Sequence, residues 1–103
     1  MSADRSPLRV AVAGLGFGAK VHLPALRSCP GTEPVALWHP RAERLEAACR
    51  EAELTGCTDF GQLLENPEVE AVVIATPPGP RFALARQALE AGKHVMLEKP
   101  VAL

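Results

Sequence analysis

A cluster of glycines follows the first apolar run of the sequence. Gly14, Gly16 and Ala19 are spaced as G-x-G-x-x-A, directly between a predicted strand and a predicted helix. Glycine at the first position permits a tight turn, glycine at the second lets the backbone approach a pyrophosphate, and a small third residue lets helix and strand pack closely. The spacing therefore predicts a dinucleotide-binding turn, which also includes Phe17 and Gly18.

The same glycines admit a second interpretation, because G-x-G-x-G also occurs in the S-adenosylmethionine loop of many methyltransferases. Those loops resemble D/E-x-G-x-G-x-G, with an acidic residue two positions before the first glycine. Val12 occupies that position in this sequence. The absence of the acid disfavours a methyltransferase, which stays open as an alternative.

The end of the second predicted strand decides which dinucleotide is expected. NAD enzymes carry an acidic residue there, roughly 20 residues beyond the glycines, which binds the ribose hydroxyls. His39 stands at that position, and neither Glu33 nor Glu43 lies where it could take over this role. Arg41 and Arg44 flank the start of the next helix, where guanidinium groups could hold a 2′-phosphate. The pattern favours NADP over NAD, although both arginines could equally be solvated helix residues.

Apolar runs of strand length alternate with segments of helical period, which predicts an α/β fold with a doubly wound parallel sheet. With right-handed crossovers the strand order is 3-2-1-4-5 in a single domain, and a ligand is expected where the order reverses, beyond the carboxyl ends of the strands. The turn over residues 76–80 opens at the same edge. The expected strands cover residues 8–13, 35–38, 55–58, 71–75 and 94–97.

Local signals set the expected helices. Pro24 should kink or restart the helix over residues 19–29, and Pro40 suits the first position of the next helix. Asp59 and Gln62 have the spacing of a capping box, and Gly92 is suited to end the last helix. The apolar face expected for that last helix consists of Phe82, Ala85 and Leu89.

Composition narrows the class of protein. The chain has 103 residues, of which 48% are hydrophobic and 4% aromatic, and its formal net charge is -1. This balance argues against nucleic acid or an anionic membrane as a partner, and the longest apolar runs are too short to span a bilayer. We expect a cytoplasmic protein.

The cysteines and histidines predict neither a disulfide framework nor a metal site. No C-x-x-C pair occurs, and the histidines lack the spacing of metal ligands. The three cysteines are expected to be small core residues: Cys29, Cys49 and Cys57.

Two further segments occur together with the glycine turn. VIATPP covers residues 73–78, and GKHVMLEKP covers residues 92–100. With GLGFGAKVHLP over residues 14–24, they resemble the glucose-fructose oxidoreductase and inositol dehydrogenase family, Gfo/Idh/MocA. The resemblance implies a Rossmann-type, NAD(P)-binding amino-terminal domain of an oxidoreductase that transfers hydride between a nicotinamide cofactor and a sugar, polyol or related hydroxy or carbonyl substrate.

The resemblance also assigns roles to residues. The lysine of E-K-P, Lys99, would lie near the nicotinamide and the substrate as the catalytic group, and Glu98 would hold or tune it. A surface ion pair is the alternative. Family members often carry a histidine where this sequence has Arg81, so no role is carried over to Arg81. The cofactor pocket would be walled by Thr76, Pro77 and Pro78.

Residues 1–103 are thus expected to form one dinucleotide-binding domain without the carboxyl-terminal substrate domain of the family. Such a truncated chain would bind dinucleotide and would act on a small-molecule substrate only with that second domain. A non-catalytic nucleotide-binding or interaction module remains the competing hypothesis. The edge of the fifth strand, over residues 94–97, is also expected to promote self-association.

Overall fold

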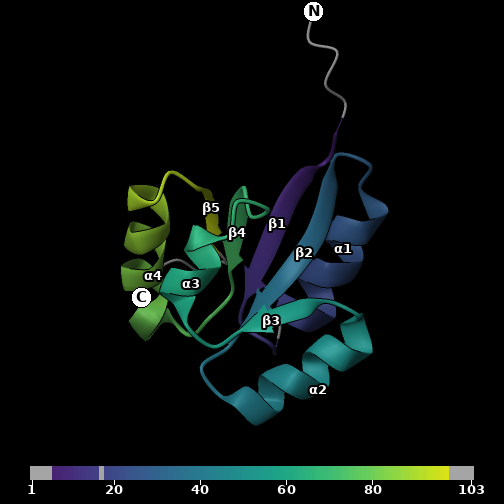
Figure 1. Ribbon diagram of the computed structural model, residues 1–103, viewed down its shortest axis with the longest axis horizontal. Coiled ribbons are helices and arrows are strands. Elements are labelled where there is room, and N and C mark those ends of the chain that lie inside the picture. The colour runs from purple at the N-terminus through teal and green to yellow at the C-terminus, as the bar shows by residue number, and fades with distance from the viewer. Residues whose placement is uncertain (1–5, 17, 98–103) are drawn as a thin grey trace, which may run out of the picture.

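The computed structural model describes residues 6–16 and 18–97. Its centre is a parallel sheet of five strands in the order β3-β2-β1-β4-β5, so the predicted fold class and strand order are confirmed (Figure 1). The strands are β1 (Leu8–Ala13), β2 (Thr32–Trp38), β3 (Thr55–Cys57), β4 (Ala71–Ile74) and β5 (His94–Leu97).

Helices cover both faces of this sheet. Leu23 and Leu45, from the first two α-helices, pack on Val12 and Leu37. The next two helices cover the opposite face, where Phe60, Leu84 and other residues form the larger core. Figure 1 shows α3 and α4 to the left of the sheet and α1 to its right. The helices are the π-helix η1 (Gly18–His22), α1 (Leu23–Ser28), α2 (Ala42–Ala52), α3 (Phe60–Glu65) and α4 (Pro78–Glu90).

The second strand is longer than the sequence predicts. β2 begins at Thr32 instead of residue 35 and contains Pro34. Val10 pairs with Pro34, but its neighbour Ala11 pairs with Ala36, so the register shifts at this point. Proline has no N–H to donate to a neighbouring strand, and an irregularity of this kind lets a central strand accommodate it.

The predicted restart at Pro24 is confirmed. The chain leaves the glycine turn as the π-helix η1 and continues as α1, with Pro24 in the first turn of α1. Proline is tolerated there because the first helical N–H groups have no partner within the helix.

Two other helix starts differ from the prediction. Pro40 lies before α2, whose N-cap is Arg41 in an extended conformation. The last helix begins at Pro78, inside the stretch over residues 76–80 that we predicted as a turn. A proline at the first helical position has the required φ and loses no hydrogen bond, so the proline-rich stretch starts α4 rather than delaying it.

The face of α4 that meets the core is also different. Phe82 and Leu89 are 52% and 61% exposed, so only Ala85 of the predicted face is buried. Apolar residues occur on several sides of this helix, and the sequence pattern therefore did not select the face that packs on α3 and β5. The buried residues of α4 are Arg81, Leu84, Ala85 and Ala88.

The local stop and cap signals were correct. An Asp59 carboxylate oxygen accepts a hydrogen bond from the backbone N–H of Gln62 at 3.2 Å, and Gly92 ends α4 with φ +82°. The prediction that all three cysteines are core residues was wrong for Cys29, which is exposed. Cys49 and Cys57 are half-buried.

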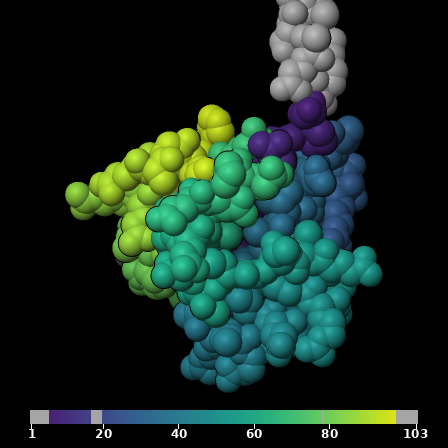
Figure 2. Space-filling view, viewed as in Figure 1, coloured from purple at the N-terminus to yellow at the C-terminus, as the bar shows by residue number. Residues whose placement is uncertain are grey.

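The two edge strands of the sheet, β3 and β5, come from different parts of the chain. The segment drawn in teal and green, which includes β3 and α3, forms much of the front face, and α4 with β5 lies at its left (Figure 2).

Within residues 6–16 and 18–97, no helix has both the length and the apolar character needed to cross a membrane.

Candidate functional site

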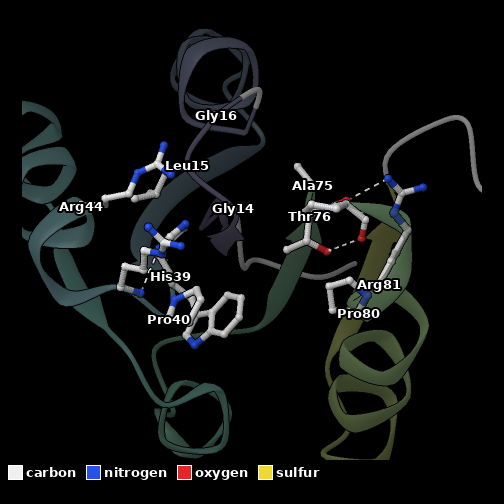
Figure 3. A pocket seen from close by; sticks show the side chains of 13 residues that line it. Gly14, Leu15, Gly16, His39, Pro40, Arg44, Ala75, Thr76, Pro80 and Arg81 are labelled. Carbon is white, nitrogen blue, oxygen red and sulfur yellow. Dashed lines mark hydrogen bonds between the residues drawn. The ribbon is translucent and has the colours of Figure 1, made fainter.

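A pocket of about 770 Å³ opens where β1, β2 and β4 end, at the predicted reversal of strand order (Figure 3). Its walls come from three turns and from the first turns of α2 and α4. The lining residues are Gly14, Leu15, Gly16, Trp38, His39, Pro40, Arg41, Arg44, Ala75, Thr76, Pro77, Pro80 and Arg81.

Gly14 closes the bottom of the pocket and has to be glycine. Its φ is +116°, and a Cβ built there would lie 2.8 Å from the carbonyl oxygen of Ala75. Its N–H donates to the Trp38 carbonyl at 3.1 Å, while the Ala75 N–H donates to the Ala13 carbonyl at 2.9 Å. The turn after β1 is therefore bonded to the ends of both neighbouring strands, and the predicted tight turn is confirmed.

Gly16 differs from Gly14 in what surrounds it. It is exposed, and among the described residues beyond its chain neighbours no atom lies within 4 Å of a Cβ built on it. The space beside it is pocket rather than protein. This is the geometry expected of a position where a ligand approaches the backbone.

The end of β2 supplies the basic side of the pocket. The Arg41 backbone N–H donates to His39 Nδ1 at 3.0 Å, so the neutral ring carries its proton on Nε2. Burial, followed by the positive charge of Arg44, lowers the pKa of His39 from its ordinary value of 6.5. At neutral pH the ring is uncharged, and the positive charge on this side comes from Arg41 and Arg44.

Trp38 is held from two sides where it borders the pocket. Its ring packs edge-on against Phe60 with centroids 5.3 Å apart, and its Nε1–H donates to the Thr58 carbonyl at 3.0 Å. Both contacts anchor the indole in the core layer of α3. The ring is thus a fixed wall.

The opposite side of the pocket is the stretch that joins β4 to α4. Thr76 is buried, and Pro77 and Pro80 border the cavity beside it. Arg81, from the first turn of α4, is only 4% exposed, and its Nη2 donates to the Thr76 carbonyl at 2.9 Å (Figure 3).

The structure brings most of the predicted cofactor-binding residues to one pocket. Gly18 and Ala19 begin η1 and Pro78 begins α4, and the surroundings of these three residues are not described. Phe17, Glu98 and Lys99 lie outside the described residues. The predicted residues that line the pocket are Gly14, Gly16, His39, Arg41, Arg44, Thr76 and Pro77.

Sequence reasoning missed several lining residues. Most of them are immediate neighbours of predicted ones and could have been found by taking each turn as a whole. Arg81 is different, because it is one of several charged residues in the sequence of α4 and nothing local indicated that it would be the one buried beside the cavity. The lining residues outside the predicted set are Leu15, Pro40, Ala75, Pro80, Arg81 and Trp38, the last of which the sequence offers either as a residue stacked near the adenine or as a packed strand-end residue.

Residues 8–103 match the GFO_IDH_MocA family, described as an oxidoreductase family with an NAD-binding Rossmann fold. The chain belongs to this family. The resemblance seen in the sequence is confirmed, and the oxidoreductase assignment removes the methyltransferase alternative.

Relatives of this Rossmann domain include characterised enzymes. An uncharacterised oxidoreductase of Synechocystis sp. is 44% identical over 96% of this chain and 27% of its own length. Galactose 1-dehydrogenase of Pseudomonas fluorescens is 39% identical over 91% of this chain and 29% of its own. The chain therefore spans less than a third of these relatives.

A solved structure gives the same result for the fold. The crystal structure of a 3-ketoreductase from Actinomadura kijaniata, in complex with NADP and TDP-benzene, superposes with a TM-score of 0.85 and 34% identity. The match covers 94% of this chain and 30% of that one.

Among the described residues, no three His, Cys, Asp or Glu side chains gather as a metal site would require.

Proposed function

We propose that this chain binds NADP(H) in preference to NAD(H) and serves in an oxidoreductase acting on a sugar, polyol or related hydroxy or carbonyl compound. The observation that carries the proposal is the single pocket that joins the Gly14–Gly16 turn to Arg41 and Arg44. The names of two relatives, a galactose dehydrogenase and an NADP-bound ketoreductase, support the substrate class and the cofactor.

Charge supports the choice of cofactor. A carboxylate at the position of His39 would accept hydrogen bonds from ribose hydroxyls and would repel a phosphate. Neutral His39 instead offers an Nε2–H donor, and two guanidinium groups stand beside it. Guanidinium groups bind phosphate oxygens through paired N–H bonds. This side of the pocket therefore suits the 2′-phosphate of NADP.

The reaction would use residues just beyond the end of β5. The nicotinamide cofactor, when bound, would supply or accept the hydride. Lys99 follows the last residue of β5 by two positions in the sequence. Its ammonium would donate a hydrogen bond to the reacting oxygen of the substrate and stabilise negative charge there. Glu98 would orient this lysine.

The proposal is tested by titrating the 103-residue chain with NADPH, NADH and S-adenosylmethionine under identical conditions. NADPH should bind more tightly than NADH, and S-adenosylmethionine should not bind. Failure of both dinucleotides to bind would refute the proposed function.

We further propose a cytoplasmic location, with neither nucleic acid nor membrane as a partner.

Changing Arg41 to alanine should weaken NADPH binding by about tenfold and leave NADH binding nearly unchanged, because a charge-assisted bond to the 2′-phosphate is lost. Dissociation constants for both cofactors check this. Arg50→Ala is the matched control, since Arg50 lies on α2, the helix that begins directly after Arg41, and pairs on the surface with Glu46. Equal losses for both cofactors would show that Arg41 does not read the 2′-phosphate.

The isolated chain should self-associate through β5. This strand pairs with β4 on one side, and no other described strand pairs with its second side. Met96, at 60% exposure, adds apolar surface beside that edge. Sedimentation should detect dimers or larger species at high concentration, and Met96→Lys should reduce them. A monomer at every concentration would contradict the prediction.

A further inference from the structure

Arg81 is the charged pocket residue to which no role has been assigned among the described residues. It is a cationic side chain with 4% of its surface exposed, and it lies in the first turn of α4 beside the cavity. A guanidinium at such depth has to be offset by hydrogen bonds to polar groups. One of these is its Nη2 bond to the Thr76 carbonyl, at 2.9 Å.

The sequence around Thr76 explains why a side chain is needed for this bond. Three of the next four residues are Pro77, Pro78 and Pro80, and none of them has a backbone N–H. Gly79 is the only backbone donor in that stretch. The buried Thr76 carbonyl therefore follows a segment that is poor in donors, and Arg81 reaches back across the turn to supply one.

This bond fixes the orientation of the peptide that forms the wall. Thr76 and Pro77 both border the cavity, so rotation of the peptide between them would change the shape of the pocket. The Thr76 hydroxyl lies 3.3 Å from the Pro77 carbonyl and donates to it, which adds a second restraint within the same turn. Arg81 thereby joins α4 to the wall.

The position of this wall suggests which part of the cofactor it meets. In doubly wound sheets the pyrophosphate lies on the turn after the first strand, and the adenosine ribose is read at the end of the second. Arg41 and Arg44 are at that second strand's end, whereas Thr76 is at the end of β4, across the reversal. The remaining half of the cofactor, which carries the nicotinamide, extends toward Thr76.

We infer that Arg81 is a positioning residue, which holds the Thr76 wall in the shape that receives the nicotinamide half of the cofactor. This inference rests on the proposed function. It concerns the shape of the wall, and it requires no direct contact between Arg81 and the ligand.

The test compares two ligands, NADPH and adenosine 2′,5′-bisphosphate, which lacks the nicotinamide half. Arg81→Met should weaken NADPH binding by about tenfold and leave the bisphosphate within about twofold of the original affinity. Arg81→Lys, which keeps a cationic donor, should restore most of the NADPH affinity. Arg86→Met is the matched control on α4, because Arg86 is exposed and bonds to Glu90, and it should change neither affinity.

Thermal melting establishes which variants are folded. If Arg81→Met does not fold, Arg81→Gln replaces it, because the shorter amide does not reach the Thr76 carbonyl. A folded variant that binds NADPH as tightly as the original chain overturns the inference, and so does an equal loss for both ligands. If the original chain binds neither ligand, the proposed function fails instead. If it binds both with equal affinity, the nicotinamide half adds no binding and the inference is overturned.

Discussion

Replacing Gly16 with valine should lower the affinity of the chain for NADPH by about a hundredfold, which corresponds to about 2.7 kcal/mol. The new side chain would project into the cavity, because no atom of the described residues beyond the chain neighbours lies within 4 Å of a Cβ at this position. It would occupy the space through which the pyrophosphate is expected to approach the backbone. Isothermal titration calorimetry with NADPH and NADH measures the loss.

The same geometry makes this variant a test of binding and not of folding. Gly16 has no positive φ, so valine adds no backbone strain there, in contrast to Gly14. Gly31→Val is the matched control, because Gly31 is equally open but lies outside the pocket. Both variants should keep the melting temperature of the original chain within a few degrees, and only Gly16→Val should lose the cofactor. Unchanged affinity in folded Gly16→Val would refute the assignment of this turn to the pyrophosphate.

We expect turnover to depend on the part of the relatives that this chain does not cover, because the chain spans less than a third of their length. Hydride transfer needs donor and acceptor carbons held close together with water excluded, and such positioning lowers the barrier by several kcal/mol. The 103-residue chain alone should therefore show no substantial dehydrogenase activity with sugars or polyols.

Fusing the chain to the remaining part of the 44% identical Synechocystis relative should create activity, and Lys99→Ala should then reduce turnover by about a thousandfold. NADPH affinity should change little in that variant, because the lysine is proposed to act on the substrate oxygen. Lys99→Arg, which keeps the charge but not its position, should recover only part of the rate. Robust turnover by the short chain alone would show that the second domain is less important than proposed.

The centre of the sheet was predictable from the sequence because β4 and most of β1 are buried on both faces. Ala71–Ile74 is apolar throughout, and such a run suits a central parallel strand better than any surface element. The strand order then followed from right-handed crossovers in two βαβ units that share the first strand. The start of β2 was missed because Pro34 normally marks a strand's end, and only the shifted pairing with β1 allows it inside.

The pocket was predictable where backbone geometry dictates the residue type, and less so where packing does. Gly14 is required by its φ and by its contact with Ala75, and this requirement is visible in the spacing of the glycines. The buried face of α4 is set by contacts with α3 and β5, which no local pattern encodes. For this reason Phe82 was expected inside and Arg81 was not, although the structure has them the other way round.

The contact between Gly14 and Ala75 bears on the thermodynamics of ligand capture. Because backbone meets backbone without an intervening side chain, and because hydrogen bonds join this turn to β2 and β4, the floor of the cavity has few conformations to lose. A ligand that settles on a floor already in its bound shape sacrifices little protein entropy. Association with the floor should therefore resemble docking onto a rigid template, and any reorganisation that accompanies it should be confined to the long arginine side chains at the rim.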